Sequence, residues 1–210
     1  MFRQLLYPFL VYRSFFYPFF VLSAITVPCW LIVRLVWIRT RRQPLSLGRE
    51  LLLLAVVVYL SGVVSATLTP NNGSRAHADA TGIRLRPSLA SLTCSSATLP
   101  VGSRARFFCK HNATGNVLLF IPLGILLPLG WRRLRFLSTM LVAIALSVSI
   151  ELLQSVSRTW GSYRLADVND VVLNGSGACL GLVLVTLLRW RRGTVGGAAR
   201  DGQRAPELGQ

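Results

Sequence analysis

Acidic residues are scarce in this sequence: its 210 residues include seven Asp and Glu against 23 Arg and Lys, a net charge of +16. Lysine is nearly missing as well, since Lys110 is the only one. A basic balance of this kind is typical of proteins that bind nucleic acid or a membrane surface. Because 52% of the residues are hydrophobic, arginines that flank membrane spans explain the charge better, and we expect no nucleic-acid partner.

The residue groupings that carry common catalytic chemistry are also missing. His77 and His111 stand apart, and no Cys/His spacing typical of a metal site occurs. No Ser, Cys or His grouping predicts nucleophilic catalysis. Without an internal repeat or a duplicated half, the sequence lacks the pattern of inverted-repeat transporters. We therefore expect no cofactor and no metal site, and an enzyme is the less favoured functional class.

The sequence also lacks the pattern of a soluble domain, in which short apolar stretches alternate with polar ones. The apolar residues come in long blocks, which predicts transmembrane helices of roughly 20 residues. The predicted spans are residues 14–38, 50–69, 116–131, 136–154 and 168–190, the third being short and interrupted by Pro122 and Pro128. The predicted fold class is an all-α integral membrane protein, a bundle of about five transmembrane helices with one long extracytoplasmic loop.

A signal peptide is the alternative interpretation of residues 1–25. That region is aromatic, carries Pro8 and Pro18, and lacks a small-x-small cleavage site. These features favour an uncleaved first span, so that residues 14–69 form the first two transmembrane helices.

Arginine-rich segments set the predicted orientation. Residues 39–49, 131–135 and 189–192 are short, basic and on one side of a five-span protein. The positive-inside rule makes that side cytoplasmic. The protein is then a multi-pass protein of the cell membrane with a cytoplasmic C-terminus, and residues 191–210 form a tail that its composition predicts to be disordered.

The four cysteines divide between the outer loop and the spans. Cys94 and Cys109 lie in the predicted extracytoplasmic loop, residues 70–115. In an oxidising exterior they could pair, and two independent thiols are the alternative. Cys29 and Cys179 fall inside spans, where cysteine usually serves as a small apolar residue.

Polar residues and glycines share one face of the fifth span. Asp167, Asp170 and Asn174 are spaced i, i+3, i+7, and Gly177 and Gly181 continue the same face. A small-xxx-small pattern lets two membrane helices approach closely. The face is therefore expected to pack inside the bundle, and a homo-oligomer through this helix stays open.

Two polar residues also share a face near the outer end of the fourth span. Glu151 and Gln154 lie there, and Asn116 opens the third span at the same level. A carboxylate about one turn inside the membrane is unfavourable unless it is paired, solvated or protonated. Arg164, in the following outer loop, is a candidate partner for Glu151.

These residues predict an outward-facing polar pocket that binds a ligand. Its candidate residues are Asn116, Glu151, Gln154, Arg164, Asp167, Asp170 and Asn174. A structural interpretation stays open for some of them, since Asp167 could cap the fifth helix while Asn174 and Gln154 join helices. Glu151 fits no cap, because the dipole at a helix C-terminus disfavours an acid.

Three motifs in order resemble the VanZ-like family of small bacterial membrane proteins. They are NVLLFIPLG (residues 116–124), IELLQ (150–154) and R-x-x-D-x-x-D-x-x-x-N-x-x-G (164–177). The resemblance implies a VanZ-like core of three transmembrane helices over residues 116–190. It also implies a location in the bacterial cell membrane and a link to the glycopeptide teicoplanin, to which the founding member of the family confers resistance.

Two functional hypotheses follow. The first is an envelope protein whose outer pocket binds a peptidoglycan precursor, a lipid headgroup or the glycopeptide itself, with membrane lipids around it. The second is a metal-dependent enzyme acting on a polyprenyl or phospholipid headgroup, in which two acids one helical turn apart hold a divalent cation. The missing catalytic groupings favour the first hypothesis.

Overall fold

The computed structural model describes residues 13–42, 46–68, 85–95, 100–131, 134–157 and 167–204. The described residues form six α-helices: α2 (Arg13–Arg41), α3 (Leu47–Leu68), α4 (Leu89–Thr93), α5 (Arg104–Gly130), α6 (Phe136–Ser157) and α7 (Val168–Arg204). Five of these helices, all except the short α4, are long and apolar enough to cross a membrane. The predicted fold class, an all-α membrane protein with five spanning helices, is confirmed.

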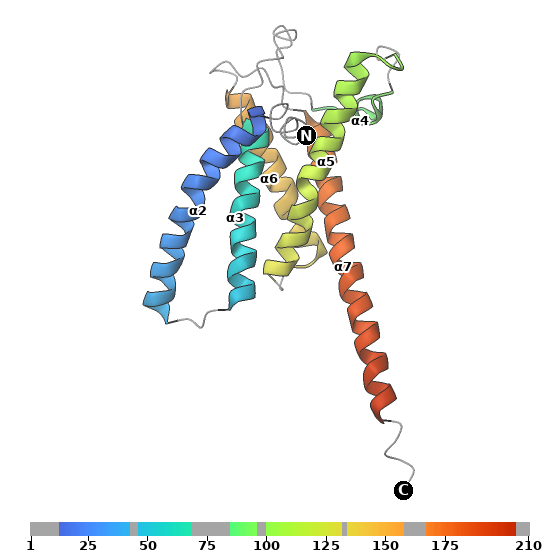
Figure 1. Ribbon diagram of the computed structural model, residues 1–210. Coiled ribbons are helices and arrows are strands. Elements are labelled where there is room, and N and C mark those ends of the chain that lie inside the picture. Colours follow the sequence, from blue (N-terminus) through green and yellow to red (C-terminus); the bar gives the residue numbers. More distant parts are fainter. Residues whose placement is uncertain are drawn as a thin grey trace, which may run out of the picture.

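The long helices stand side by side and alternate in direction along the chain (Figure 1). One end of the bundle, which we call the loop end, carries α4 and the starts of α5 and α7. The other end, which we call the arginine end, carries the turns after α2 and α5 and the continuation of α7. The described arginines of the arginine end are Arg39, Arg41, Arg42, Arg49, Arg135, Arg189 and Arg191.

The third span is longer than the sequence predicts. Helix α5 begins at Arg104 rather than at Asn116, because Ser103 acts as an N-cap and its hydroxyl accepts a hydrogen bond from the Arg106 amide. The helix also continues through Pro122 and Pro128 instead of breaking. Proline is tolerated in a membrane helix when neighbouring helices satisfy the freed carbonyl groups.

Pro122 and Pro128 free the carbonyl groups of Leu118 and Gly124. Two long side chains donate hydrogen bonds to other carbonyl groups of α5 close to these prolines. The hydroxyl of Tyr59 on α3 donates to the Leu119 carbonyl at 3.0 Å, three residues before Pro122. The guanidinium of Arg189 on α7 donates to the Pro128 carbonyl at 2.8 Å, in the last turn of α5. Both ends of the proline-containing stretch are thereby anchored to neighbouring helices.

Helix α7 extends beyond the predicted membrane span, and Figure 1 shows it projecting past the arginine end of the other helices. It continues as helix to Arg204, where the sequence predicted a disordered tail. No proline lies between Val168 and Arg204, and helix propensity alone does not account for the extension, because residues 193–204 include four glycines.

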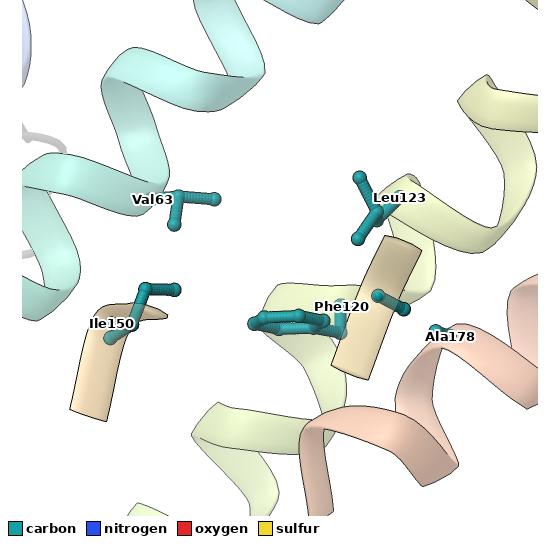
Figure 2. Packing of buried hydrophobic residues seen from close by; sticks show 6 residues of the cluster. Val63, Phe120, Leu123, Ile150 and Ala178 are labelled. Carbon is teal, nitrogen blue, oxygen red and sulfur yellow. The ribbon is translucent and has the colours of Figure 1, made fainter. Parts of the chain in front are cut away.

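The apolar core is built by four of the five long helices. Figure 2 shows Phe120 and Leu123 of α5 near Val63 of α3, Ile150 of α6 and Ala178 of α7. The Phe120 side chain is completely buried. None of these residues comes from α2, so the core forms without the first helix.

Helices α5 and α7 touch through their backbones. A Cβ atom added to Gly177 would overlap the Val117 carbonyl, and one added to Gly181 would overlap the Ile121 carbonyl. From the other side, a Cβ on Gly124 would overlap the backbone of Ala178. Close approach of this kind is what small residues permit between membrane helices. The Gly177 and Gly181 face is therefore occupied by α5 of the same chain, and a homodimer through it would have to displace α5.

Candidate functional site

The first turn of α7 is held by two carboxylates from different helices. Asp167 caps its own helix, since its Oδ1 accepts hydrogen bonds from the Asn169 amide at 2.9 Å and from the Asn169 side chain at 2.7 Å. Glu151 of α6 accepts a hydrogen bond from the Asp167 backbone N–H at 3.0 Å. In a capping box the second of these roles belongs to an acid in the helix's own first turn. Here a neighbouring helix supplies it.

This contact gives Glu151 a structural partner that the sequence did not reveal. The Glu151 side chain is 7% exposed and lies in the C-terminal part of α6. The dipole of its own helix disfavours the charge there, whereas the positive end of α7 favours it. Sequence reasoning considered only the helix that carries Glu151, and the favourable dipole belongs to a helix whose capping residue, Asp167, lies 16 positions later in the chain.

The side chain of Asp170 faces α5. It occupies the position from which an acid would usually cap α7, and its Oδ1 instead lies 3.4 Å from the amide nitrogen of Asn112. Asp170 is partly exposed and Asn112 is exposed. Asp167 is partly exposed as well, whereas Glu151 is buried.

Asn169 belongs to the site although the sequence analysis did not select it. The side chain is 4% exposed, and its Oδ1 accepts a hydrogen bond from the Ser88 backbone N–H at 2.9 Å. It therefore joins α7 to the segment that contains α4. It is off the helix face shared by Asp167 and Asp170. The signal that could have found it is local: an amide two residues after an N-cap acid.

We call Asn112, Glu151, Asp167, Asn169 and Asp170 the loop-end cluster. Its members come from α5, α6 and α7 together with the residue that caps α7. All of them lie at the loop end, where the sequence placed the outer pocket.

Asn116 and Asn174 lie deeper between the same three helices. Asn174 is 3% exposed and donates through its amide nitrogen to the Ser147 hydroxyl at 2.8 Å. Its Oδ1 has no hydrogen-bond partner among the described residues, and neither has the buried amide nitrogen of Asn116. Asn116 precedes Val117, which touches Gly177 one turn after Asn174, so the two amides are at similar depth.

The other two candidates of the predicted pocket are Gln154 and Arg164. Gln154 is buried and donates to the Thr67 carbonyl in the last turn of α3 at 2.8 Å, which satisfies a carbonyl group that a helix end leaves open. It joins two helices rather than facing the acids. Arg164 lies outside the described residues.

The segment that contains α4 is tied to the bundle at two points. Cys94, at the end of α4, and Cys109, in the first turns of α5, form a disulfide. The Asn169 bond to Ser88 supplies the second attachment, to α7. The described part of the segment is thereby held close to the loop-end cluster.

The metal-dependent hypothesis finds no ligand set in the described part of the chain. No group of three or more His, Cys, Asp and Glu side chains there lies close enough together to hold a metal ion. Asp167 and Glu151 both use carboxylate oxygens on the backbone of α7 instead.

Comparison with known proteins places this geometry in context. A family model described as VanZ/LLP1 matches residues 50–189, which include α3 and the outer segment as well as the 116–190 core that the motifs indicated. Protein VanZ of Enterococcus faecium is 33% identical over 72 residues, 34% of this chain. The matched part spans 42% of the length of that relative. No solved structure matches.

Proposed function

This chain is a membrane protein that belongs to the VanZ/LLP1 family, and we propose that it lowers the susceptibility of a bacterial cell to teicoplanin-type glycopeptides. In this proposal the loop-end cluster binds the polar part of a lipid-linked peptidoglycan precursor on the outer face of the membrane. Bound precursor would be shielded from a glycopeptide, which acts outside the membrane on lipid-linked precursors.

The placement of charge supports an outward-facing loop end. The short turns of the arginine end are strongly basic, and short basic turns stay in the cytoplasm. The basic residues of the long outer segment carry less weight, because long loops cross the membrane largely regardless of charge. The loop-end cluster then lies at the outer headgroups, at the level of the precursor's polar part.

One observation carries the proposal: the partly exposed carboxylate of Asp170 lies beside the exposed side-chain amide of Asn112 at the loop end. Asp167 and Glu151 both stabilise the first turn of α7, whereas Asp170 is turned toward the exposed Asn112. A carboxylate beside an amide can accept and donate hydrogen bonds to the amide and amine groups of a peptide-bearing precursor.

The test is glycopeptide tolerance in a sensitive Gram-positive host. Wild type and Asp170→Asn would be expressed at amounts matched by membrane immunoblot. We expect wild type to raise teicoplanin tolerance several-fold and Asp170→Asn to lose most of that gain, since removing the charge weakens a charge-assisted hydrogen bond by a factor of about ten. Ser176→Ala is the matched control on α7, because the exposed Ser176 hydroxyl bonds only to the Val172 carbonyl of its own helix.

Two outcomes would contradict the proposal. A wild-type protein that leaves tolerance unchanged would remove the glycopeptide role. If the Asp170→Asn variant protects as well as wild type, the glycopeptide role stands, but Asp170 is not part of the binding site.

A further inference from the structure

A second surface at the loop end combines positive charge with exposed apolar side chains. We call residues 85–95 and 100–111 the collar. It contains Arg86, Arg104, Arg106 and Lys110, and neither Asp nor Glu. None of these four cations forms an ion pair with a residue that the structure describes. Within the described part of the chain, the collar therefore carries positive charge that no acid pairs with.

Large apolar side chains of the collar are exposed. They are Leu85, Leu89, Val101, Phe107 and Phe108, each at least 60% exposed. Apolar residues exposed to this extent beyond the end of a bundle need a partner other than water.

The length of α5 places Phe107 and Phe108, near its start, at the height of the lipid headgroups. Its 27 residues measure about 40 Å at 1.5 Å per residue, whereas the hydrocarbon core of a bilayer is about 30 Å thick. Phe107 lies about 7 Å along the axis beyond Asn112, in the direction away from the membrane centre. That offset is comparable to the thickness of one headgroup layer, about 5–8 Å.

The orientation of Phe107 continues the outward face of α5. Leu118, which is 59% exposed, lies 11 residues further along, three helical turns, and thus on the same face. Because Leu118 faces outward from the bundle within the span, Phe107 is directed toward the lipid that surrounds the bundle. The adjacent exposed cations Arg104 and Lys110 are then within reach of lipid phosphates.

The collar is held in position rather than freely tethered. The disulfide between Cys94 and Cys109 joins its two halves, and the bond from Ser88 to Asn169 fixes it to α7. A fixed surface loses less conformational entropy on binding than a flexible loop does.

We propose that the collar docks on anionic phospholipid headgroups of the leaflet at the loop end, with its aromatic side chains in the interface and its cations on the phosphates. Charge complementarity is the reason for choosing an anionic lipid, since four cations without a described counter-ion gain nothing from a neutral surface. The inference does not depend on the proposed glycopeptide role, because it concerns the collar and not the loop-end cluster.

Backbone hydrogen exchange of the full-length protein in lipid nanodiscs tests this docking. One set of discs would contain phosphatidylcholine alone, and the other phosphatidylcholine mixed with phosphatidylglycerol. We expect exchange in residues 85–95 to slow several-fold in the phosphatidylglycerol discs, and high salt to remove the difference, because screening shortens the range of these charges from about 8 Å to about 3 Å.

Charge-matched variants localise the effect. The collar variant replaces Arg86, Arg104, Arg106 and Lys110 with Gln, and the control variant replaces Arg39, Arg41, Arg42 and Arg49 at the arginine end with Gln. We expect the collar variant to exchange equally in both discs and the control variant to behave like wild type.

The proposal is overturned if wild-type exchange is the same in both discs, or if the control variant loses the difference along with the collar variant. Should the collar variant fail to assemble, the salt series on wild type still decides, since a slowing that persists at high salt excludes an electrostatic dock. Equal slowing in both discs relative to detergent would show apolar anchoring without selection for charge.

Discussion

Helices α2 and α7 are both apolar enough to span a membrane, yet they relate to the rest of the molecule in opposite ways. In the most apolar stretch of α7, 39% of the residues are buried, against none in that of α2. The family model matches residues 50–189, which include α7 as far as Arg189 and none of α2. Hydropathy therefore identifies a span without saying whether it belongs to the core.

The difference follows from how each helix is held. Helix α7 meets α5 backbone to backbone at its glycines. Helix α2 meets α3 through side chains: Thr26 pairs with Ser61 at 2.8 Å, and Arg34 forms a bidentate ion pair with Glu50 at 2.6 and 2.7 Å. In lipid, apolar helices gain little from mutual burial, so close packing and polar bonds decide association. Close backbone packing therefore makes α7 part of the helix core, whereas a few polar side-chain contacts attach α2 to the outside of that core.

The largest expected effect comes from adding a side chain where α5 and α7 pack backbone to backbone at Gly177 and Gly181, a contact that we call the glycine seam. Gly177→Leu would drive a side chain into the Val117 carbonyl, where neither backbone can move without separating α5 from α7. We expect destabilisation of about 3 kcal/mol or more, the upper range for overpacking, or failure to accumulate in the membrane. Reversible unfolding in mixed detergent micelles measures it.

Gly175→Ala is the matched control for the seam. A Cβ at Gly175 meets nothing within 4 Å, and alanine favours a helix over glycine by up to about 1 kcal/mol. The comparison fails if the two variants lose similar stability, since the seam would then not be what holds α7.

An intermediate effect is expected at the acid that joins α6 to α7. Glu151→Leu leaves the Asp167 backbone N–H without its acceptor, and a buried orphan donor costs about 1–3 kcal/mol. Glu151→Gln keeps a side-chain oxygen at the same place and should retain most of the stability. The same unfolding assay separates the two variants. If Glu151→Gln is as unstable as Glu151→Leu, the loss of stability comes from removing the negative charge of Glu151 and not from the missing hydrogen-bond acceptor.

The smallest effect on the core is expected from the ion pair of α2. Replacing both Arg34 and Glu50 with Gln removes the bidentate contact without leaving a lone charge in the membrane. We expect faster hydrogen exchange in α2 and unchanged exchange in α5 and α7, measured peptide by peptide in nanodiscs. Equal loosening of all helices would show that α2 supports the core after all.

Several features of the fold were predictable from sequence because membrane spans are a property of composition over about 20 residues. The second, fourth and fifth spans begin within a few residues of the predicted positions. The third span was predicted too short because residues 104–115 were assigned to the outer loop, whereas the helix begins after the Ser103 cap. The bonds from Tyr59 and Arg189 near Pro122 and Pro128 come from helices distant in sequence.

The candidate site was predicted in outline and altered in its details. Periodicity placed Asp167, Asp170 and Asn174 on one face, but each has a different partner: the start of α7 itself, Asn112 of α5 and Ser147 of α6. Gln154 bonds to α3, away from the acids. Helical spacing gives the face on which a residue lies, and it cannot say which of several neighbouring helices that face meets.

By itself the sequence determined that this protein is a helical membrane protein, how many apolar helices it has, which ends carry arginine and that Glu151, Asp167 and Asp170 lie near the opposite end. These are local properties, since a backbone in lipid must satisfy its hydrogen bonds within each helix. Only the tertiary structure decided that Glu151 completes the cap of α7, that Asn169 holds the outer segment and that α5 occupies the glycine face. Those contacts join residues far apart in the chain, and they depend on helix direction and close packing, which no single segment specifies.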